Sequence, residues 1–179
     1  AMEAAGLALQ MDEKAEGGWI SWLNTTEKTS GIYKLLAFFG PIGGAVMLGL
    51  VFAGVLPEAF LGIWILIGIG FLSRVFQPLK RAAEAIPSSV TLKSLLIRSD
   101  LIEKENFNSG ELNKAKAALI KDGVSSSSQL ADLDKLGLWA QNRINLLYLP
   151  INLLFWTDFA LFIQLAAWKK RVGQSLSHL

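Results

Sequence analysis

The sequence contains no cysteine and only one histidine, His178. Without cysteine the chain has no disulfide framework, no thiolate nucleophile and no zinc–cysteine site. It also lacks a GxxxxGK[ST] loop, a GxGxxG turn between a strand and a helix, and an HExxH motif, and one histidine completes no Ser/His/Asp set. We therefore expect no catalytic, cofactor-binding or metal site in this chain, and no enzyme activity of its own.

Charge is also scarce. Charged residues make up 18% of the sequence and the formal net charge is +2, which is too small to indicate nucleic-acid binding from charge alone. Glu103 and Glu105 lie two positions apart on a predicted helix end and face different directions, so they do not form a general acid–base pair. We interpret both as solvated charges.

Hydrophobic residues make up 52% of the sequence and concentrate between Leu35 and Leu72, where Glu58 is the only ionisable residue. Split at Leu56-Pro57-Glu58, this stretch gives two apolar segments of the length that crosses a hydrocarbon core of about 30 Å. The pattern predicts a transmembrane helical hairpin. The alternative is a pair of helices buried inside a soluble assembly, because an all-round apolar helix indicates burial without saying in what.

The charges around this hairpin predict its orientation. Basic residues flank both outer ends, whereas the turn between the two segments has none. By the positive-inside rule, both ends are expected at the cytoplasmic face of the inner or plasma membrane, or in the cytoplasm if the hairpin is buried in a soluble assembly. Within the first segment, Gly40 and Gly44 form a small-xxx-small pair, which favours close helix contact. The flanking basic residues are Lys28, Lys34, Arg74, Lys80 and Arg81.

After the hairpin, the sequence predicts a series of helices. Pro78 and Pro87 are expected to punctuate the return of the chain to water. From Val90 to Asp100, apolar residues recur at helical spacing and predict one buried face that includes Leu92, Leu95, Leu96 and Ile102. The residues expected to cap helices are Ser88 or Ser89, Asn108 with Glu111, Gly123, and Ser126 with Gln129.

The final apolar stretch predicts a long core helix from Gln129 to Trp168, kinked or restarted at Pro150. Because Asp158 is the only ionisable residue between Ile144 and Trp168, a third membrane span is the alternative. On one continuous helix the polar residues of this stretch share no stripe, so no polar seam is expected. We hypothesise instead that Arg143, Asn145 and Asp158 form a buried polar network between core helices.

The whole chain is predicted to be all-α, because no alternation of period two survives anywhere. We expect a helical bundle of long core helices with the apolar hairpin attached. The predicted segments are residues 1–31, an N-terminal helical or interfacial segment; 32–76, the hairpin; and 77–179, a helical core domain. Ala1 precedes Met2 as an expression scar does, and residues 173–179 stop within polar, helix-compatible sequence, so we expect a fragment of a larger protein.

The second half of the chain carries two motifs in order. The first is a helix that ends in an acidic-aromatic turn, and the second is a run of leucines, an R-x-N, and then Trp and Asp. The residues of these motifs are Leu95, Ile102, Glu103, Phe107, Ser109, Leu112, Leu130, Leu133, Leu136, Arg143, Asn145, Asn152, Trp156, Asp158 and Trp168. With them the second half resembles the helical core, or lever, region of the MutS family of DNA mismatch repair ATPases, in particular a membrane-associated MutS-like branch. Thr157 separates the Trp and Asp, which are adjacent in the family.

This resemblance implies a lever that couples nucleotide state to distant parts of the protein. It implies a following ATPase domain with a Walker A loop, ATP and Mg in the parent protein, and a homodimer. It assigns no nucleotide-binding or DNA-contacting residue to this chain, so DNA is an expected partner of the parent and not of the fragment. It also implies a hydrophobic hairpin before the core helices, which matches Leu35 to Leu72.

Two readings from other classes stay open. The chain can be a small integral membrane scaffold with a cytoplasmic helical bundle and no link to DNA. It can also be a soluble helical oligomerisation module that buries its apolar hairpin against a partner, which predicts expression without detergent.

Overall fold

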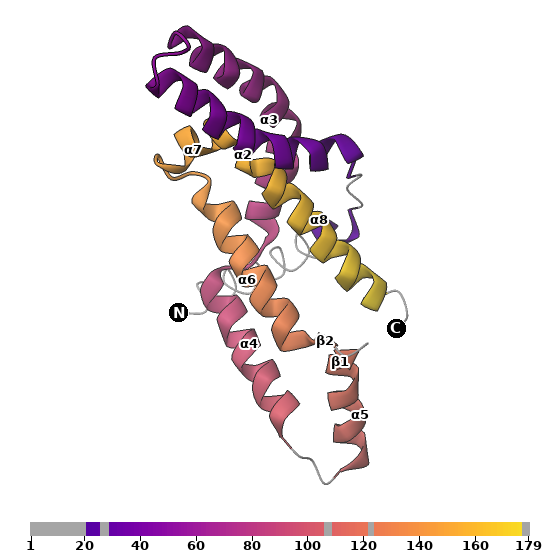
Figure 1. Ribbon diagram of the computed structural model, residues 1–179. Helices are drawn as coiled ribbons and strands as arrows, with labels where there is room; N and C mark the ends of the chain where they lie inside the picture. The colour runs from indigo at the N-terminus through magenta and orange to yellow at the C-terminus, as the bar shows by residue number, and fades with distance from the viewer. Residues whose placement is uncertain (1–20, 26–28, 106–108, 122–123, 177–179) are drawn as a thin grey trace, which may run out of the picture. The chain divides into compact units, whose positions relative to one another are not determined.

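The computed structural model describes residues 21–25, 29–105, 109–121 and 124–176 (Figure 1). These residues confirm the predicted all-α fold class, with one addition, a two-residue antiparallel ladder in which Ile120 pairs with Ser125. The predicted caps Asn108 and Gly123 lie outside the described residues. The elements are α2 (Gly31–Phe52), α3 (Ala59–Ala85), α4 (Ser89–Lys104), α5 (Gly110–Leu119), β1 (Ile120–Lys121), β2 (Val124–Ser125), α6 (Ser126–Asn142), α7 (Tyr148–Phe155) and α8 (Thr157–Leu176).

The chain forms two compact units that interleave in sequence. We call residues 25–84 and 139–167 the hairpin unit, and the remaining residues, 1–24, 85–138 and 168–179, the second unit. The sequence-based division into three consecutive segments stays a prediction.

In the hairpin unit, α2 and α3 run side by side as the predicted apolar hairpin (Figure 1). Ser30 caps α2, because its Oγ accepts a hydrogen bond from the backbone N–H of Ile32 at 3.4 Å. The connecting residues 53–58 include Gly54 at φ +70°, a conformation that glycine adopts without strain. The two helices are therefore joined by a tight, locally determined turn.

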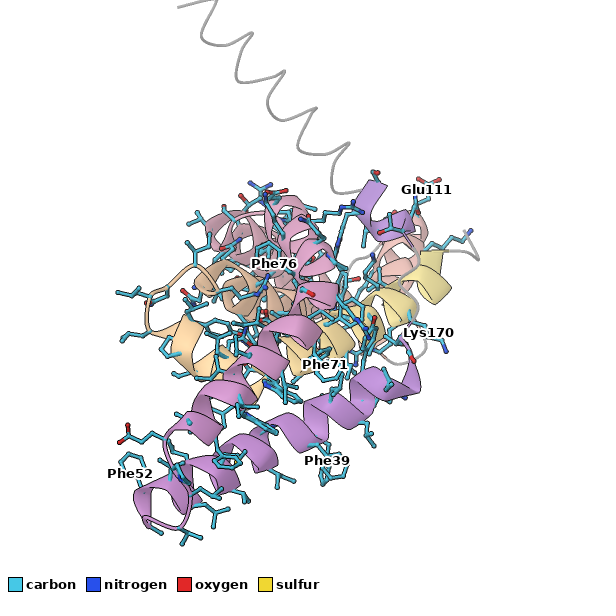
Figure 2. The ribbon with its side chains drawn as sticks, turned by 90° about the horizontal axis from the view of Figure 1, so that it is seen from above. Phe39, Phe52, Phe71, Phe76, Glu111 and Lys170 are labelled. Atoms are coloured by element: carbon cyan, nitrogen blue, oxygen red, sulfur yellow. The ribbon has the colours of Figure 1, made fainter. Side chains whose placement is uncertain are left out.

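Both helices are long and apolar enough to cross a membrane. Only 11% of the apolar window of α2 and 17% of that of α3 is buried, so most of this apolar surface is open to its surroundings. Figure 2 shows Phe39 and Phe52 projecting outward from α2, and these side chains are 52% and 84% exposed. The described structure thus has two candidate spans, or three if α7 and α8 count as one bent span.

The expectation that Pro78 interrupts the chain is wrong, because α3 continues through it to Ala85. A proline inside a helix removes one backbone hydrogen bond. Here Val75, Leu79 and Ala82, spaced three and four residues apart, remain buried on one face of α3. The apolar packing of this face accounts for the continuity of the helix.

The second unit is held by a core of aromatic and aliphatic side chains. Trp22 stacks on Trp168 with ring centroids 6.5 Å apart, and the Trp168 Nε1 donates to the backbone oxygen of Gln129 at 3.0 Å. On α4, the predicted buried face is only partly confirmed, because Leu92 is buried but Leu95 and Ile102 are each 40% exposed.

The helix starts of the second unit rest on serine side chains. Ser88 caps α4 as predicted, accepting a hydrogen bond from the N–H of Thr91 at 3.3 Å. The cap of α6 lies one residue before the predicted one, because Ser125 accepts from the N–H of Ser128 at 3.2 Å. The prediction of a solvated Glu103 is also wrong, since its carboxylate accepts from the N–H and Oγ of Ser127, at 3.0 and 2.7 Å.

Candidate functional site: a buried ion pair at a helical corner

The long helix predicted from Gln129 to Trp168 is broken at two places, neither of them Pro150. α6 ends at Asn142, and the Asn145 Oδ1 accepts from the N–H of Leu147 at 3.1 Å, stabilising a turn in place of the helix. Pro150 lies in the first turn of α7, where a missing N–H costs no helical hydrogen bond. At Trp156 the backbone turns left-handed, with φ 52° and ψ 39°, so α7 and α8 meet at a bend of 88°.

At this corner Arg143 and Asp158 form a bidentate ion pair. The guanidinium donates from Nε to Oδ1 at 2.8 Å and from Nη2 to Oδ2 at 2.5 Å. The two side chains are only 10% and 2% exposed, so the pair is largely removed from solvent. A planar guanidinium holds a carboxylate in one orientation through two parallel hydrogen bonds, so this pair fixes the end of α6 against the start of α8.

Tyr148 and Asn152 complete the surroundings of Asp158. The Tyr148 hydroxyl donates to Asp158 Oδ1 at 2.9 Å and accepts from the Trp139 Nε1 at 3.0 Å. The Asn152 Oδ1 accepts from the N–H of Asp158 at 2.9 Å and from the Thr157 hydroxyl at 3.0 Å. The side chains of Arg143, Tyr148, Asn152 and Asp158 are thereby hydrogen-bonded at the corner, as buried polar groups usually are, whereas the buried Trp156 Nε1 has no hydrogen-bond partner.

The structure brings Arg143 and Asp158 together and leaves Asn145 apart from them, in its own local turn. Sequence reasoning missed Tyr148, Asn152 and Thr157, because it placed the polar residues on one continuous helix, where they do not align. Thr157 and Asp158, directly after an apolar run, are residue types that favour a helix start, and they were the available signal for the break.

Three glycines let this corner pack closely against the hairpin within the same unit. A Cβ added at Gly40 would lie 2.7 Å from the Cβ of Trp156, while one at Gly44 would overlap the backbone oxygen of Leu154 and one at Gly68 the Nε1 of Trp156. The predicted close-contact role of Gly40 and Gly44 is therefore confirmed, with the α7–α8 corner as their partner.

Two stacked indoles join the corner to α3. The rings of Trp64 and Trp156 lie 4.5 Å apart with planes 9° from parallel. The Trp64 Nε1 also donates to the backbone oxygen of Leu154 at 2.9 Å. This bond pairs a carbonyl of the last turn of α7, a position that has no partner within its own helix.

A cavity of about 650 Å³ lies between α3 and the corner, mostly apolar with the ion pair on its wall. The Arg143 guanidinium sits 5.5 Å from the centre of the Phe76 ring, which Figure 2 labels on α3. Lining residues are Ile69, Leu72, Ser73, Phe76, Gln77, Arg143, Tyr148, Leu149, Asn152, Leu153 and Asp158.

At this corner the Arg143, Tyr148 and Asp158 side chains are hydrogen-bonded to one another. Among the described residues no group of three or more acidic or histidine side chains could hold a metal ion. Comparison with known proteins gave no match to a family model, to a curated protein or to a solved structure.

Proposed function

We propose that this chain is the membrane-anchored helical connector of a MutS-like protein, in which it couples an ATPase domain to the membrane. The observation that carries the proposal is the corner at Arg143 and Asp158, which joins the end of α6 to the start of α8 and packs on an apolar hairpin of membrane-spanning length. Coupling between distant sites needs packed elements with discrete arrangements, and a bidentate buried ion pair supplies such an arrangement.

The membrane part of the proposal is supported by the hairpin. α2 and α3 expose many large apolar side chains, among them Phe38, Val46, Ile63 and Leu66, each more than half exposed. Exposed apolar side chains gathered on two helices mark a surface that meets a membrane or a partner. The basic residues Lys34 and Arg74 at its outer ends favour a hairpin whose two ends lie on the cytoplasmic side.

The connector part is supported by helices that leave the hairpin unit. Residues 126–138 of α6 and 168–176 of α8 belong to the second unit, while the ends that meet at the corner belong to the hairpin unit. Helices shared between two units are what a connector requires. ATP and Mg binding, a homodimer and action on DNA are then proposed for the parent protein, and none of these for this chain alone.

Fractionation tests the membrane anchor. We expect the expressed chain to stay with membranes through high-salt and carbonate washes and to need detergent for extraction. A discrete soluble oligomer on a sizing column would instead identify the hairpin as an intersubunit core.

The link to an ATPase is tested on the parent gene and protein. We expect a GxxxxGK[ST] motif downstream in the same reading frame, and ATPase activity of the full-length protein that changes in Arg143→Met. The exposed Lys93→Ala on α4 is the control and should leave this activity unchanged. A reading frame that ends at Leu179 would favour the small membrane scaffold.

A further inference from the structure

We infer that α7 and the first turns of α8 form a re-entrant element of the membrane domain, which enters the bilayer beside the hairpin, turns at Trp156 and leaves on the side from which it entered. The inference rests on the proposed membrane-spanning hairpin. Figure 1 shows α7 alongside α2, in agreement with the close contacts of Gly40 and Gly44. The occupant of the outer face of this element is the lipid bilayer.

The helical rise gives the depth of the turn. We take Lys34 and Arg74 as the boundary of the apolar layer on the side of the hairpin's ends. At 1.5 Å per residue, Gly40 and Gly68 each lie about 9 Å below this boundary, and Gly44 lies about 15 Å below it. These glycines contact Leu154, Phe155 and Trp156. The end of α7 therefore lies near the middle of an apolar layer of about 30 Å.

The start of α7 lies near the boundary. Tyr148 and Leu149 line the same cavity as Ser73 and Phe76, which flank Arg74 on α3. The preceding Arg143 sits over the Phe76 ring, so the basic side chain stays at the polar edge of the layer. α7 thus descends from the boundary to the middle of the layer.

The first turns of α8 lead back toward the same boundary. Its Phe159 and Phe162 rings pack on Tyr33, with ring centroids 5.8 and 5.5 Å away. Tyr33 directly precedes Lys34, at the basic end of α2. With the bend of 88° at Trp156, the chain goes down in α7 beside α2 and comes back in α8 toward Tyr33, which is a re-entrant course and not a third crossing.

The hydrogen bonds of the backbone at the turn suit a site without water. In lipid, irregular backbone is tolerated only where protein groups satisfy it. The backbone oxygen of Leu154 accepts a hydrogen bond from the Trp64 indole at 2.9 Å, and the backbone oxygen of Asn152 accepts one from the backbone N–H of Trp156 at 2.7 Å. Asp158 is paired as membrane carboxylates usually are. The turn can therefore lie inside the bilayer without leaving these groups unpaired.

The outer surface of the element is apolar and open. Leu149 and Ile151 on α7 are 52% and 49% exposed. The preceding turn exposes Ile144, Leu146 and Leu147 by 92, 83 and 73%. Because α7 packs against α2, acyl chains that cover α2 and α3 would reach this surface too.

Single-cysteine labelling tests the inference directly, because the natural chain has no cysteine to remove. We would introduce one cysteine at a time and add a membrane-impermeant maleimide to sealed vesicles of each orientation. Ile151→Cys reports on α7, and Ile63→Cys on α3, about 17 Å below Arg74 by the helical rise, is the matched control that is expected to face lipid. Lys135→Cys on α6, Lys170→Cys on α8 and Val55→Cys in the hairpin turn report the side of the membrane to which each position is exposed.

We expect Ile151→Cys and Ile63→Cys to react only after denaturation in detergent. Lys135→Cys and Lys170→Cys should react from one side, and Val55→Cys from the other. Rapid labelling of Ile151→Cys in vesicles with Ile63→Cys still protected would overturn the re-entrant element and leave the hairpin standing. Lys135→Cys and Lys170→Cys on opposite sides would overturn it in favour of a complete third span, whereas labelling of Ile63→Cys in vesicles would overturn the hairpin itself.

Discussion

Arg143 and Asp158, fifteen positions apart, form a two-pronged ion pair across the corner between α6 and α8. The two side chains are only 10% and 2% exposed. Removing one partner therefore leaves a buried, unpaired charge and lowers the free energy of unfolding more than it does for a surface ion pair. The predictions below concern this corner first and then the contacts that position it.

Asp158→Leu leaves a buried guanidinium and the Tyr148 hydroxyl without their acceptor. We expect the free energy of unfolding to fall by about 3–5 kcal/mol, measured by denaturant titration in detergent. The double variant Arg143→Met, Asp158→Leu should recover much of this loss. Lys104→Ala is the matched control, since its ion pair with Asp100 is exposed and worth less than about 1 kcal/mol; an equal loss in this control would contradict the prediction.

Gly44→Ala places a methyl group against the backbone oxygen of Leu154. Because backbone cannot rotate out of the way as a side chain can, we expect α7 to shift from α2 and the melting temperature in detergent to drop by several degrees. Gly49→Ala on the same helix has open space around the new Cβ, so it should leave the melting temperature unchanged or raise it. Similar effects of the two substitutions would argue against the close contact.

Trp64→Phe keeps an aromatic ring for stacking on Trp156 and removes the donor to Leu154. We expect a loss of about 1–3 kcal/mol, the cost of leaving a buried carbonyl unpaired. Trp64→Ala, which also removes the stacking, should cost more. The two variants are compared by denaturant titration, and equal losses would assign the whole effect to the hydrogen bond.

Glu103→Ala removes the carboxylate that receives the N–H and hydroxyl of Ser127 at the start of α6. Loss of a helix cap costs about 0.5–2 kcal/mol, so we expect a modest fall in stability and faster amide exchange in the first turn of α6. Glu105→Ala, at the nearby exposed position, is the control. No change in exchange at residues 126–129 would contradict the prediction.

The parts that could be predicted from sequence are those set by local pattern. The apolar runs on either side of Pro57 fixed α2 and α3, and Ser88 marked the start of α4, because burial period and cap chemistry act over a few residues. The corner was not predictable in the same way. The course of the chain at the corner depends on the left-handed backbone of Trp156, a residue type that rarely adopts it. It also depends on Gly40 and Gly68, which leave room for the indole ring.

The candidate site was predicted only in part, because some of its residues meet only after the chain has bent. Arg143 and Asp158 stood out because buried charges need partners. Asn145 was grouped with them by proximity in sequence, whereas its side chain closes a local turn. Tyr148 and Asn152 lie on the face toward Asp158 only after the chain has bent by 88°, and such a bend is a tertiary feature.

Trp156 packs between Gly40 of α2 and Gly68 of α3. The sizes of the side chains at these positions therefore depend on one another. An indole at a left-handed position is held there by the space that two missing side chains leave. A Cβ at position 68 would overlap the indole Nε1 of Trp156, so Gly68→Ala combined with Trp156→Phe should be better tolerated than Gly68→Ala alone. Homologous chains with the same corner should show this reciprocity of size at positions 68 and 156.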